Sequence, residues 1–441
     1  MRLLAKTFRG QILTAGSSAY ESARVPYNLN FSAVRPLAVV RPVDAADVAT
    51  VVKWSAKEHV PIVARSGGHS YGGYSTTHGV VVDLGLLSHV TLSGNKAVIG
   101  PGARLGNVYA TLGAHGLAVP AGTCPSVGVG GHILGGGFGL ASRAWGLLCD
   151  NMLGAQVVTA DGSVLNVDAK HHSDLYWACR GGGGGNFGIA TRFVTRTHRI
   201  TSGSYFVASY PWSQVEEVVA GFLAWAPATS DAVGSICRLA AGGAPTVQIF
   251  GQYVGPQSEL QSVLAGLKPA ASHLVIGTSS WLDLVARWAG CLGHSLPGCA
   301  TPVDVAFVGS SSYIGRVPSA SQLTLFREAI EERGSQSGAL LIDAYGGAIN
   351  RVAPTTTAFP HRRALASVQY FAAGGSSARA WVSQARAQLA PSMTGEAYVN
   401  YIDPQLPNAL HAYYGANLPR LVKVKHAYDP HNLFHFAQSV H

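Results

Sequence analysis

A short run of small and polar residues, Arg65 to Ser70 (Arg-Ser-Gly-Gly-His-Ser), follows an apolar stretch that predicts a β-strand. Glycine and serine at a strand end let backbone N–H groups approach an anionic ligand closely, and Arg65 can add positive charge. The run therefore predicts a loop able to hold a pyrophosphate. Taken alone, His69 within it is an ordinary loop histidine.

A second glycine-rich run, Gly122 to Gly139, has eight glycines among its eighteen residues. A backbone this bare can line a flat ligand without intervening side chains. The run also carries Cys124, which on its own is most simply a buried thiol. Only the combination of the two runs points to a site.

Two matches to other enzyme motifs do not fit the elements expected around them. Gly68 to Gly72 matches G-x-S-x-G, which in serine hydrolases needs a helix directly after the nucleophile, whereas another strand is expected here. Gly183 to Gly188 matches the dinucleotide fingerprint, which needs a strand before it and a helix after it, and the expected order is reversed. A serine hydrolase at Ser70 stays as a remote alternative.

Taken together, the motifs resemble the berberine-bridge-enzyme branch of the vanillyl-alcohol-oxidase flavoproteins, over nearly the whole chain. The later matching segments are 185–189 (Gly-Asn-Phe-Gly-Ile), 359–362 (Phe-Pro-His-Arg), 398–403 (Tyr-Val-Asn-Tyr-Ile-Asp) and a tail from Arg420 to Ser439. The resemblance implies an α+β, two-domain vanillyl-alcohol-oxidase-type FAD-binding fold. Its substrate domain would be an antiparallel sheet covered by helices.

The resemblance also implies FAD held by two covalent bonds, from His69 to the 8α-methyl group and from Cys124 to C6 of the isoalloxazine. Both residue types suit this role, because an imidazole nitrogen and a thiolate can add to an electron-poor ring. The cofactor-binding residues that it implies are Arg65, Ser66, Gly67, Gly68, Ser70, Gly122, Val127, Gly130, Gly131, His132, Gly135, Ile189 and Asn432.

By the same resemblance Tyr401 is the catalytic base, which as a phenolate takes a hydroxyl proton while hydride leaves the adjacent carbon. An unperturbed tyrosine has a pKa near ~10, so a cation or strong donor must lower it. Many plant relatives place a lysine two residues before a glutamine on the neighbouring strand; here the glutamine is Gln369, but Ser367 stands at the lysine position. Arg363 and Lys423 are candidate substitutes. The plainer interpretation of Tyr401 is an aromatic side chain packed on a sheet.

The activity implied is an oxidase that removes a hydride from an alcohol or hemiacetal carbon of a carbohydrate or natural product and reduces O2 to H2O2. Val127 occupies the family position that controls oxygen access, and a small aliphatic residue there is typical of oxidases. A sugar would suit a polar, aromatic cleft, to which Tyr71, Tyr345, Tyr370 and Tyr401 are candidates. The alternatives are oxidative cyclisation of a phenolic or alkaloid substrate, which favours a carboxylate base where Gln369 stands, a flavin dehydrogenase with another acceptor, and a non-catalytic flavin-binding module.

Composition narrows the class of protein. Of 441 residues 47% are hydrophobic, which excludes a mainly disordered chain, and no apolar run approaches the ~20 residues that cross a bilayer. The net charge of +9 lies in short clusters rather than a stripe, so no nucleic-acid partner is predicted. No C-x-x-C is present, and the spacing of His426, His431 and His435 fits no zinc site, so no metal is predicted.

Hydrophobic patterning predicts a β-α-β unit over 34–65, a helix over 104–115 and hairpins around 93–95 and 161–162. We expect an FAD-binding domain over 1–200, a substrate-binding domain over 201–394, and a segment over 395–441 that returns to the first domain. Cys291 and Cys299 are close enough for a local disulfide, or are two buried thiols. No apolar leader is seen, so a cytoplasmic location is expected, although a secreted chain stripped of its leader would look the same. The oligomeric state is left open.

Overall fold

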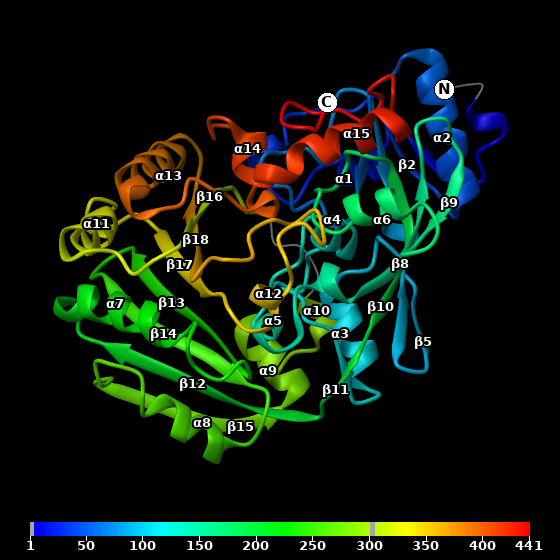
Figure 1. Cartoon of the computed structure of the whole chain (residues 1–441). Helices are drawn as coiled ribbons and strands as arrows, with labels where there is room; N and C mark the ends of the chain where they lie inside the picture. The colour runs from blue at the N-terminus through cyan, green and yellow to red at the C-terminus, as the bar shows by residue number, and fades with distance from the viewer. Residues whose placement is uncertain (1–3, 300–304) are drawn as a thin grey trace.

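The computed structural model describes residues 4–299 and 305–441. Met1 to Leu3, the start of the segment that was searched for an apolar leader, lie outside the described residues. The chain forms a mixed α+β fold (Figure 1). The first part of the chain holds a four-stranded sheet, a five-stranded sheet and a two-stranded sheet of β7 (Leu117–Ala118) and β11 (His198–Arg199), and one large sheet belongs to the second part. The smaller sheets and the large one lie on opposite sides of the molecule, and the segments between them carry the site.

The first sheet has the order β1 (Gln11–Leu13), β2 (Ala38–Arg41), β4 (Val80–Asp83), β3 (Ile62–Arg65). The strands of the predicted β-α-β unit, β2 and β3, both pair parallel with β4, which lies between them. The connecting helix α2 (Ala45–Glu58) begins where predicted, because Asp44 accepts a hydrogen bond from the Asp47 N–H at 3.0 Å. The buried face of α2 packs on this sheet, and β3 ends at Arg65.

The second sheet is antiparallel, in the order β5 (Val90–Ser93), β6 (Lys96–Ile99), β10 (Ile189–Arg196), β8 (Met152–Val158), β9 (Val164–Val167). The hairpins predicted from the turn residues are β5–β6 and β8–β9. The helices of this part are α1 (Ser18–Arg24), α3 (Leu105–Gly113), α4 (Val129–Leu134), α5 (Ser142–Trp145) and α6 (Ser173–Ala178). The second glycine-rich run spans α4 and the turns around it.

The large sheet has seven antiparallel strands, in the order β15 (His273–Ser280), β12 (Ser202–Tyr210), β14 (Thr246–Tyr253), β13 (Val233–Ala241), β17 (Gly338–Ala344), β18 (Ala366–Ala373), β16 (Phe307–Ile314). Helices α7 (Val215–Trp225), α11 (Ala320–Glu331) and α13 (Ser376–Leu389) cover one face (Figure 1). Strand side chains alternate, so Leu340 and Ile342 pack under the helices and Leu341 and Asp343 point to the other face. That open face is turned toward the first part of the chain.

Two helices of the expected substrate-binding domain also contact the first part of the chain. Helix α10 (Leu296–Cys299) packs on α3, helix α9 (Trp281–Trp288) packs on α3 and on the strands β12 and β15, and apolar side chains of both helices belong to the core of the first part. Cys291 and Cys299 between them form a disulfide, which decides between the two predicted interpretations. The remaining helices of the second part are α8 (Gln257–Leu264) and α12 (Ala348–Arg351).

The C-terminal segment crosses back over the first part of the chain (Figure 1). Its helices are α14 (Ala409–Tyr414) and α15 (Leu418–Tyr428), and α15 packs against α6. Tyr413 and Leu421 join the core of the first part. The tail therefore contributes to the same structural unit as residues near the N-terminus.

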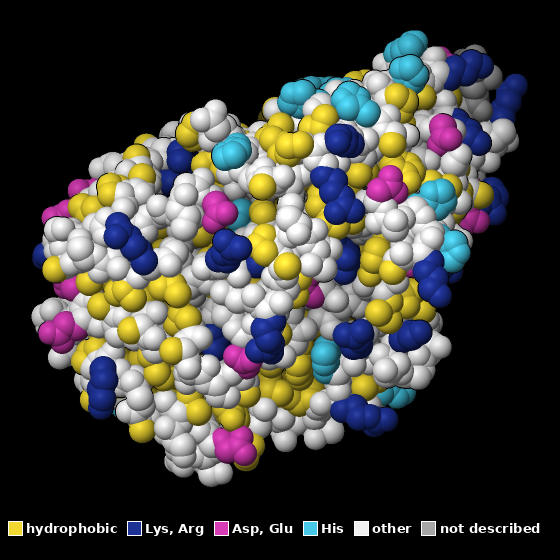
Figure 2. Space-filling view, viewed as in Figure 1, with side chains coloured by type: hydrophobic (Ala, Val, Ile, Leu, Met, Phe, Trp, Pro, Cys, Tyr) yellow, Lys and Arg dark blue, Asp and Glu magenta, His cyan; other side chains and the backbone are white. Residues whose placement is uncertain are grey.

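On the face drawn in Figure 2, Lys and Arg side chains are scattered among acidic and neutral ones. No helix within the described ranges is both long enough and apolar enough to cross a membrane. The same residues contain no group of three or more His, Cys, Asp or Glu able to hold a metal ion.

Candidate active site

A cavity of about 500 Å³ lies between the glycine-rich loops of the first part and the open face of the large sheet. The sheet contributes Leu341, Asp343, Gln369 and Phe371 to its wall. The predicted site residues that line it are Ser66, Gly67, Gly68, His69, Ser70, Gly122, Cys124, Val127, Gly130, Gly131, His132, Ile189, Gln369 and Tyr401. Residues spread over most of the sequence thus meet around one space.

The loop after β3 presents unused hydrogen-bond donors to this cavity. The backbone N–H groups of Gly67, Gly68, His69 and Ser70 have no acceptor among the described residues. A Cβ on Gly67 would lie 2.4 Å from the Gly128 nitrogen, so the two glycine-rich runs are in direct backbone contact. A row of free N–H groups on such a loop suits an anion such as pyrophosphate.

His69 and Cys124 come from the two different runs and lie on either side of Ser126. The Ser126 hydroxyl is 3.0 Å from His69 Nε2 and 3.3 Å from Cys124 Sγ. Burial lowers the pKa of His69 to about 3, with a smaller contribution from the Arg104 charge, so the imidazole is neutral at physiological pH. Because Ser126 engages Nε2, the other ring nitrogen is the one available for reaction.

Cys124 differs from the other free cysteines of the described residues, since Cys149, Cys179 and Cys237 are buried and it is half-buried in the cavity wall. Burial raises the pKa of Cys179 to about 12, which makes it inert. His132 steadies the segment that precedes Cys124, because its Nε2 accepts the Gly122 N–H at 3.0 Å. Burial lowers the pKa of His132 to about 4, which keeps it a neutral acceptor.

The residues present fit FAD. Free N–H donors lie on one loop, a neutral imidazole and an accessible thiol lie together, and the wall is bare backbone at Gly131, where a Cβ would meet nothing within 4 Å. Phe434, His435 and Phe436 of the C-terminal tail complete the wall, although the sequence analysis named none of them as a cofactor-binding residue. The aromatic character of Phe434 and Phe436 was the available sign.

At the sheet end of the cavity, Tyr401 in the 3₁₀ turn η7 (Val399–Tyr401) stacks on Tyr71, with ring centroids 5.3 Å apart. Gln369 Nε2 donates to the Tyr71 hydroxyl at 2.6 Å. Burial raises the pKa of Tyr401 well above its ordinary value, and the nearby Asp343 raises it further. Tyr401 is therefore a neutral phenol in this structure, not a phenolate.

The two candidate substitutes for the family lysine do not act on Tyr401. Arg363 and Lys423 are both exposed at the surface, and neither is among the charges that shift the pKa of Tyr401. The expectation that one of them lowers this pKa is corrected: the strongest charge beside the phenol is a carboxyl group, with the opposite effect.

That carboxyl group, Asp343, is a functional candidate that sequence reasoning missed. It is 4% exposed and is paired across the sheet with Ile236 and Ser367. Burial raises its pKa to about 8, and its Oδ2 has no hydrogen-bond partner among the described residues. A lone acid in the apolar strand 338–344 was visible in the sequence, but only the strand register shows that it faces the cavity.

Several predicted residues lie outside the cavity wall. Arg65 does not reach an anion site, because its buried guanidinium donates to the carbonyls of Ala23, Arg24 and Ser75. Gly135 lies against the Asn400 side chain, and Asn432 is exposed in a turn with φ of 50°. Of the expected cleft tyrosines, Tyr345 and Tyr370 pack into cores behind the wall.

Neither of the rival motifs has the surroundings that its chemistry needs. Ser70 accepts a hydrogen bond from the Tyr74 N–H at 3.1 Å, and the next regular element is the strand β4 rather than a helix. The 183–188 run follows the helix α6 and precedes the strand β10. The nucleophile elbow and the Rossmann turn are therefore both absent from these two segments.

Comparison with known proteins gives two family matches within the chain: "FAD binding domain" over residues 36–168 and "Berberine and berberine like" over residues 397–441. The uncharacterized FAD-linked oxidoreductase YgaK of Bacillus subtilis is 34% identical over 98% of this chain and 96% of its own length. The chitooligosaccharide oxidase of Gibberella zeae is 31% identical over 96% of this chain and 91% of its own. The structure of Physcomitrella patens BBE-like 1 superposes with a TM-score of 0.93 at 30% identity, covering 100% of this chain and 98% of that one.

Proposed function

Because the chain belongs to the berberine-bridge-enzyme-like family of FAD-linked oxidoreductases, we propose that it is an oxidase acting on a CH–OH group of a carbohydrate or related hydroxyl compound. The family and the two-domain α+β fold implied by the sequence motifs are confirmed. The observation that carries the proposal is the position of Tyr401 and Asp343, which line the same cavity as His69 and Cys124.

When bound, FAD would supply a hydride acceptor that O2 can reoxidise to give H2O2. His69 and Cys124 would tether it, and the N–H groups of Gly67 to Ser70 would bind its pyrophosphate. The neutral His69 imidazole has a free lone pair, as a covalent attachment requires. Val127 lies in the wall three residues beyond Cys124, at the position that the family resemblance assigns to oxygen access.

Asp343 and Tyr401 would handle the substrate proton. The phenol of Tyr401 orients the substrate hydroxyl, and the Asp343 carboxylate is the acceptor for the proton, directly or by way of the phenol. A general base works best when its pKa lies near the operating pH, and burial places that of Asp343 at about 8. Gln369 fixes Tyr71, which stacks on Tyr401 and limits its orientation.

One observation favours a second candidate function. Oxidative cyclisation of a phenolic substrate needs a carboxylate base, and Asp343 supplies it on the strand next to Gln369, where the sequence suggested only an amide. The apolar wall residues Ile236, Leu341 and Phe371 suit an aromatic substrate. A sugar oxidase and a cyclising oxidase would thus share the base and differ in substrate.

The test is a substrate screen on the flavin-loaded protein. Mono- and oligosaccharides, secondary alcohols and phenolic amines are incubated in air, and peroxide release and product mass are measured. Peroxide formed with loss of two hydrogens from a sugar supports the proposal, and ring closure of a phenol supports the second candidate. Flavin reduction without reoxidation by O2 would instead indicate a dehydrogenase and overturn the oxidase assignment.

A further inference from the structure

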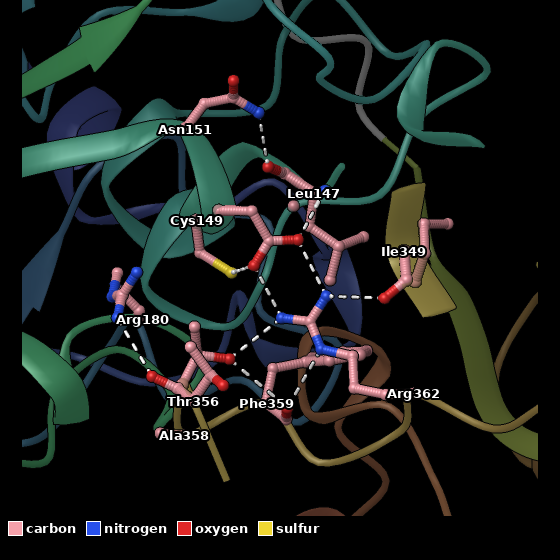
Figure 3. Close-up of polar contacts among 12 residues, drawn as sticks. Leu147, Cys149, Asn151, Arg180, Ile349, Thr356, Ala358, Phe359 and Arg362 are labelled. Atoms are coloured by element: carbon pink, nitrogen blue, oxygen red, sulfur yellow. Dashed lines mark hydrogen bonds and ion pairs between the residues drawn. The ribbon is translucent and has the colours of Figure 1, made fainter. Parts of the chain in front are cut away.

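In the Phe-Pro-His-Arg segment (359–362), the guanidinium group of Arg362 uses all its N–H groups in hydrogen bonds, although Arg362 lies outside the cavity wall. The side chain of Arg362 is fully buried and donates to both carboxylate oxygens of Asp150, at 2.7 and 2.6 Å (Figure 3). Asp150 lies in the 3₁₀ turn η4 (Leu148–Asn151) of the first part of the chain, and Arg362 lies just before β18 in the second. The pair therefore ties the two parts together.

All five N–H donors of this guanidinium are used. Besides Asp150, they reach the carbonyls of Ile349 and Phe359 at 3.3 Å each and the Thr357 hydroxyl at 2.9 Å. Asp150 also accepts the Leu147 N–H at 2.9 Å. A lysine has three donors on one nitrogen and cannot reproduce this pattern.

A continuous set of contacts leads from this pair to Tyr398. Leu148 and Cys149 of η4 donate their N–H groups to the carbonyls of Gly137 and Gly136, at 2.9 and 2.8 Å. The N–H groups of Gly137 and Phe138 in turn donate to the Tyr398 hydroxyl, at 2.9 and 3.3 Å.

A second, aromatic route reaches Tyr398 and continues to the phenol at the cavity. The Arg362 guanidinium lies 4.8 Å from the Phe359 ring centroid, and Phe359 meets Tyr398 edge-on at 5.9 Å. Tyr398 meets Tyr401 edge-on at 5.1 Å. Both routes start at Arg362 and end at the ring that packs directly on Tyr401.

We propose that the Arg362–Asp150 pair is a positioning device for Tyr401: it fixes Tyr398 from two sides, and Tyr398 fixes the orientation of the Tyr401 phenol toward the substrate. This inference rests on the proposed function, in which Tyr401 orients the substrate hydroxyl. Neither Arg362 nor Asp150 touches the cavity, so their effect passes entirely through Tyr398 and its neighbours.

The test is a double-mutant cycle between Arg362→Lys and Tyr401→Phe, read as the limiting rate of anaerobic flavin reduction by substrate. Arg362→Lys should lower this rate by about 10- to 100-fold, because small displacements of a reacting group are that costly, with flavin content kept. In the Tyr401→Phe background the same change should alter the rate by less than about twofold, since the group through which it acts is gone. Asp150→Asn, which keeps the shape, is the second variant and should behave in the same way.

Arg333→Lys is the matched control. Arg333 is also buried and donates to three backbone carbonyls, but on the helix-covered side of the large sheet. It should lower the melting temperature without changing the reduction rate. If Arg362→Lys slows reduction equally in both backgrounds, Arg362 is merely structural and the inference is wrong. If flavin in the Tyr401→Phe variant is reduced at the normal rate, the Tyr401 phenol has no role in the reaction. That result would contradict the proposed function, and it is distinct from the result that contradicts this inference.

Discussion

His69 and Cys124 reach the same place from separate loops, and Ser126 lies within hydrogen-bond distance of both. The two attachments proposed for these side chains predict a stepwise loss of the bound flavin. His69→Ala should leave flavin on the protein through Cys124, and His69→Ala with Cys124→Ala should release it on acid precipitation. Absorbance of the pellet and intact mass measure this, with the buried Cys179→Ala as control. Complete release from the single His69 variant would contradict a second attachment.

The pKa of Asp343 predicts the pH dependence of catalysis. Burial raises this pKa to about 8, so below pH 8 the carboxyl group is mostly protonated and cannot accept a proton. We expect kcat/KM to rise with pH up to about 8 and then level off. Asp343→Asn should lower the rate by about 10²- to 10⁴-fold, the usual contribution of a general base, and remove the rise. The same rise in the Asp343→Asn variant would assign the base elsewhere.

At the scale of elements, strand β17 combines apolar packing on one face with this acid on the other. The folded state binds a proton that the unfolded chain, with an ordinary Asp pKa near ~3.9, releases. Stability should therefore fall as pH rises from about 4 to about 8. Asp343→Asn should raise the melting temperature, and by more at pH 8 than at pH 5. An equal shift at both pH values would show that ionisation of Asp343 is not the cause.

In helix α4, a single substitution should raise the stability of the protein and lower its binding of the cofactor. Gly131 lies in this helix and lines the cavity, and a Cβ there meets no protein atom within 4 Å. Gly131→Ala should stabilise the flavin-free protein slightly, by up to about 1 kcal/mol, because alanine favours helix. The same methyl group enters the cavity, so flavin loading should fall. Flavin content and melting temperature are compared with those of Gly375→Ala, which lies outside the cavity; undiminished loading in Gly131→Ala would contradict the placement of the cofactor.

At the scale of the whole molecule, a buried lysine of the tail joins the tail to the first part of the chain. Lys425 donates to Asp429 and to the carbonyls of Asn186 and Phe434, which joins the tail to the glycine-rich 181–188 segment. Lys425→Met leaves the Asp429 charge buried and unpaired, which typically costs about 3–5 kcal/mol.

We therefore expect Lys425→Met to lower the melting temperature strongly and to expose the tail to limited proteolysis. Adding Asp429→Asn removes the unpaired charge and should recover part of the loss. No recovery in the double variant would mean that the hydrogen bonds to the carbonyls, rather than the charge, hold the tail.

Local features of the fold were predictable because neighbours in sequence decide them. The Asp44 cap, the hairpins and the glycine-rich loops depend on residues a few positions apart, and the structure has all of them. Helices α9 and α10, expected in the domain over 201–394, also pack on α3 of the first part. Such packing depends on contacts between segments that are far apart in the sequence.

The sequence by itself determined the family and the α+β class, because contiguous motifs carry both, and it led to the proposal that His69 and Cys124 act together. Only the tertiary structure decided the electrostatics around Tyr401. The strongest charge acting on that phenol is Asp343, on a strand distant in sequence, and not a nearby cation. A pKa depends on burial and on charges a few ångströms away in space, and the seven-stranded register, not sequence distance, brings those charges together.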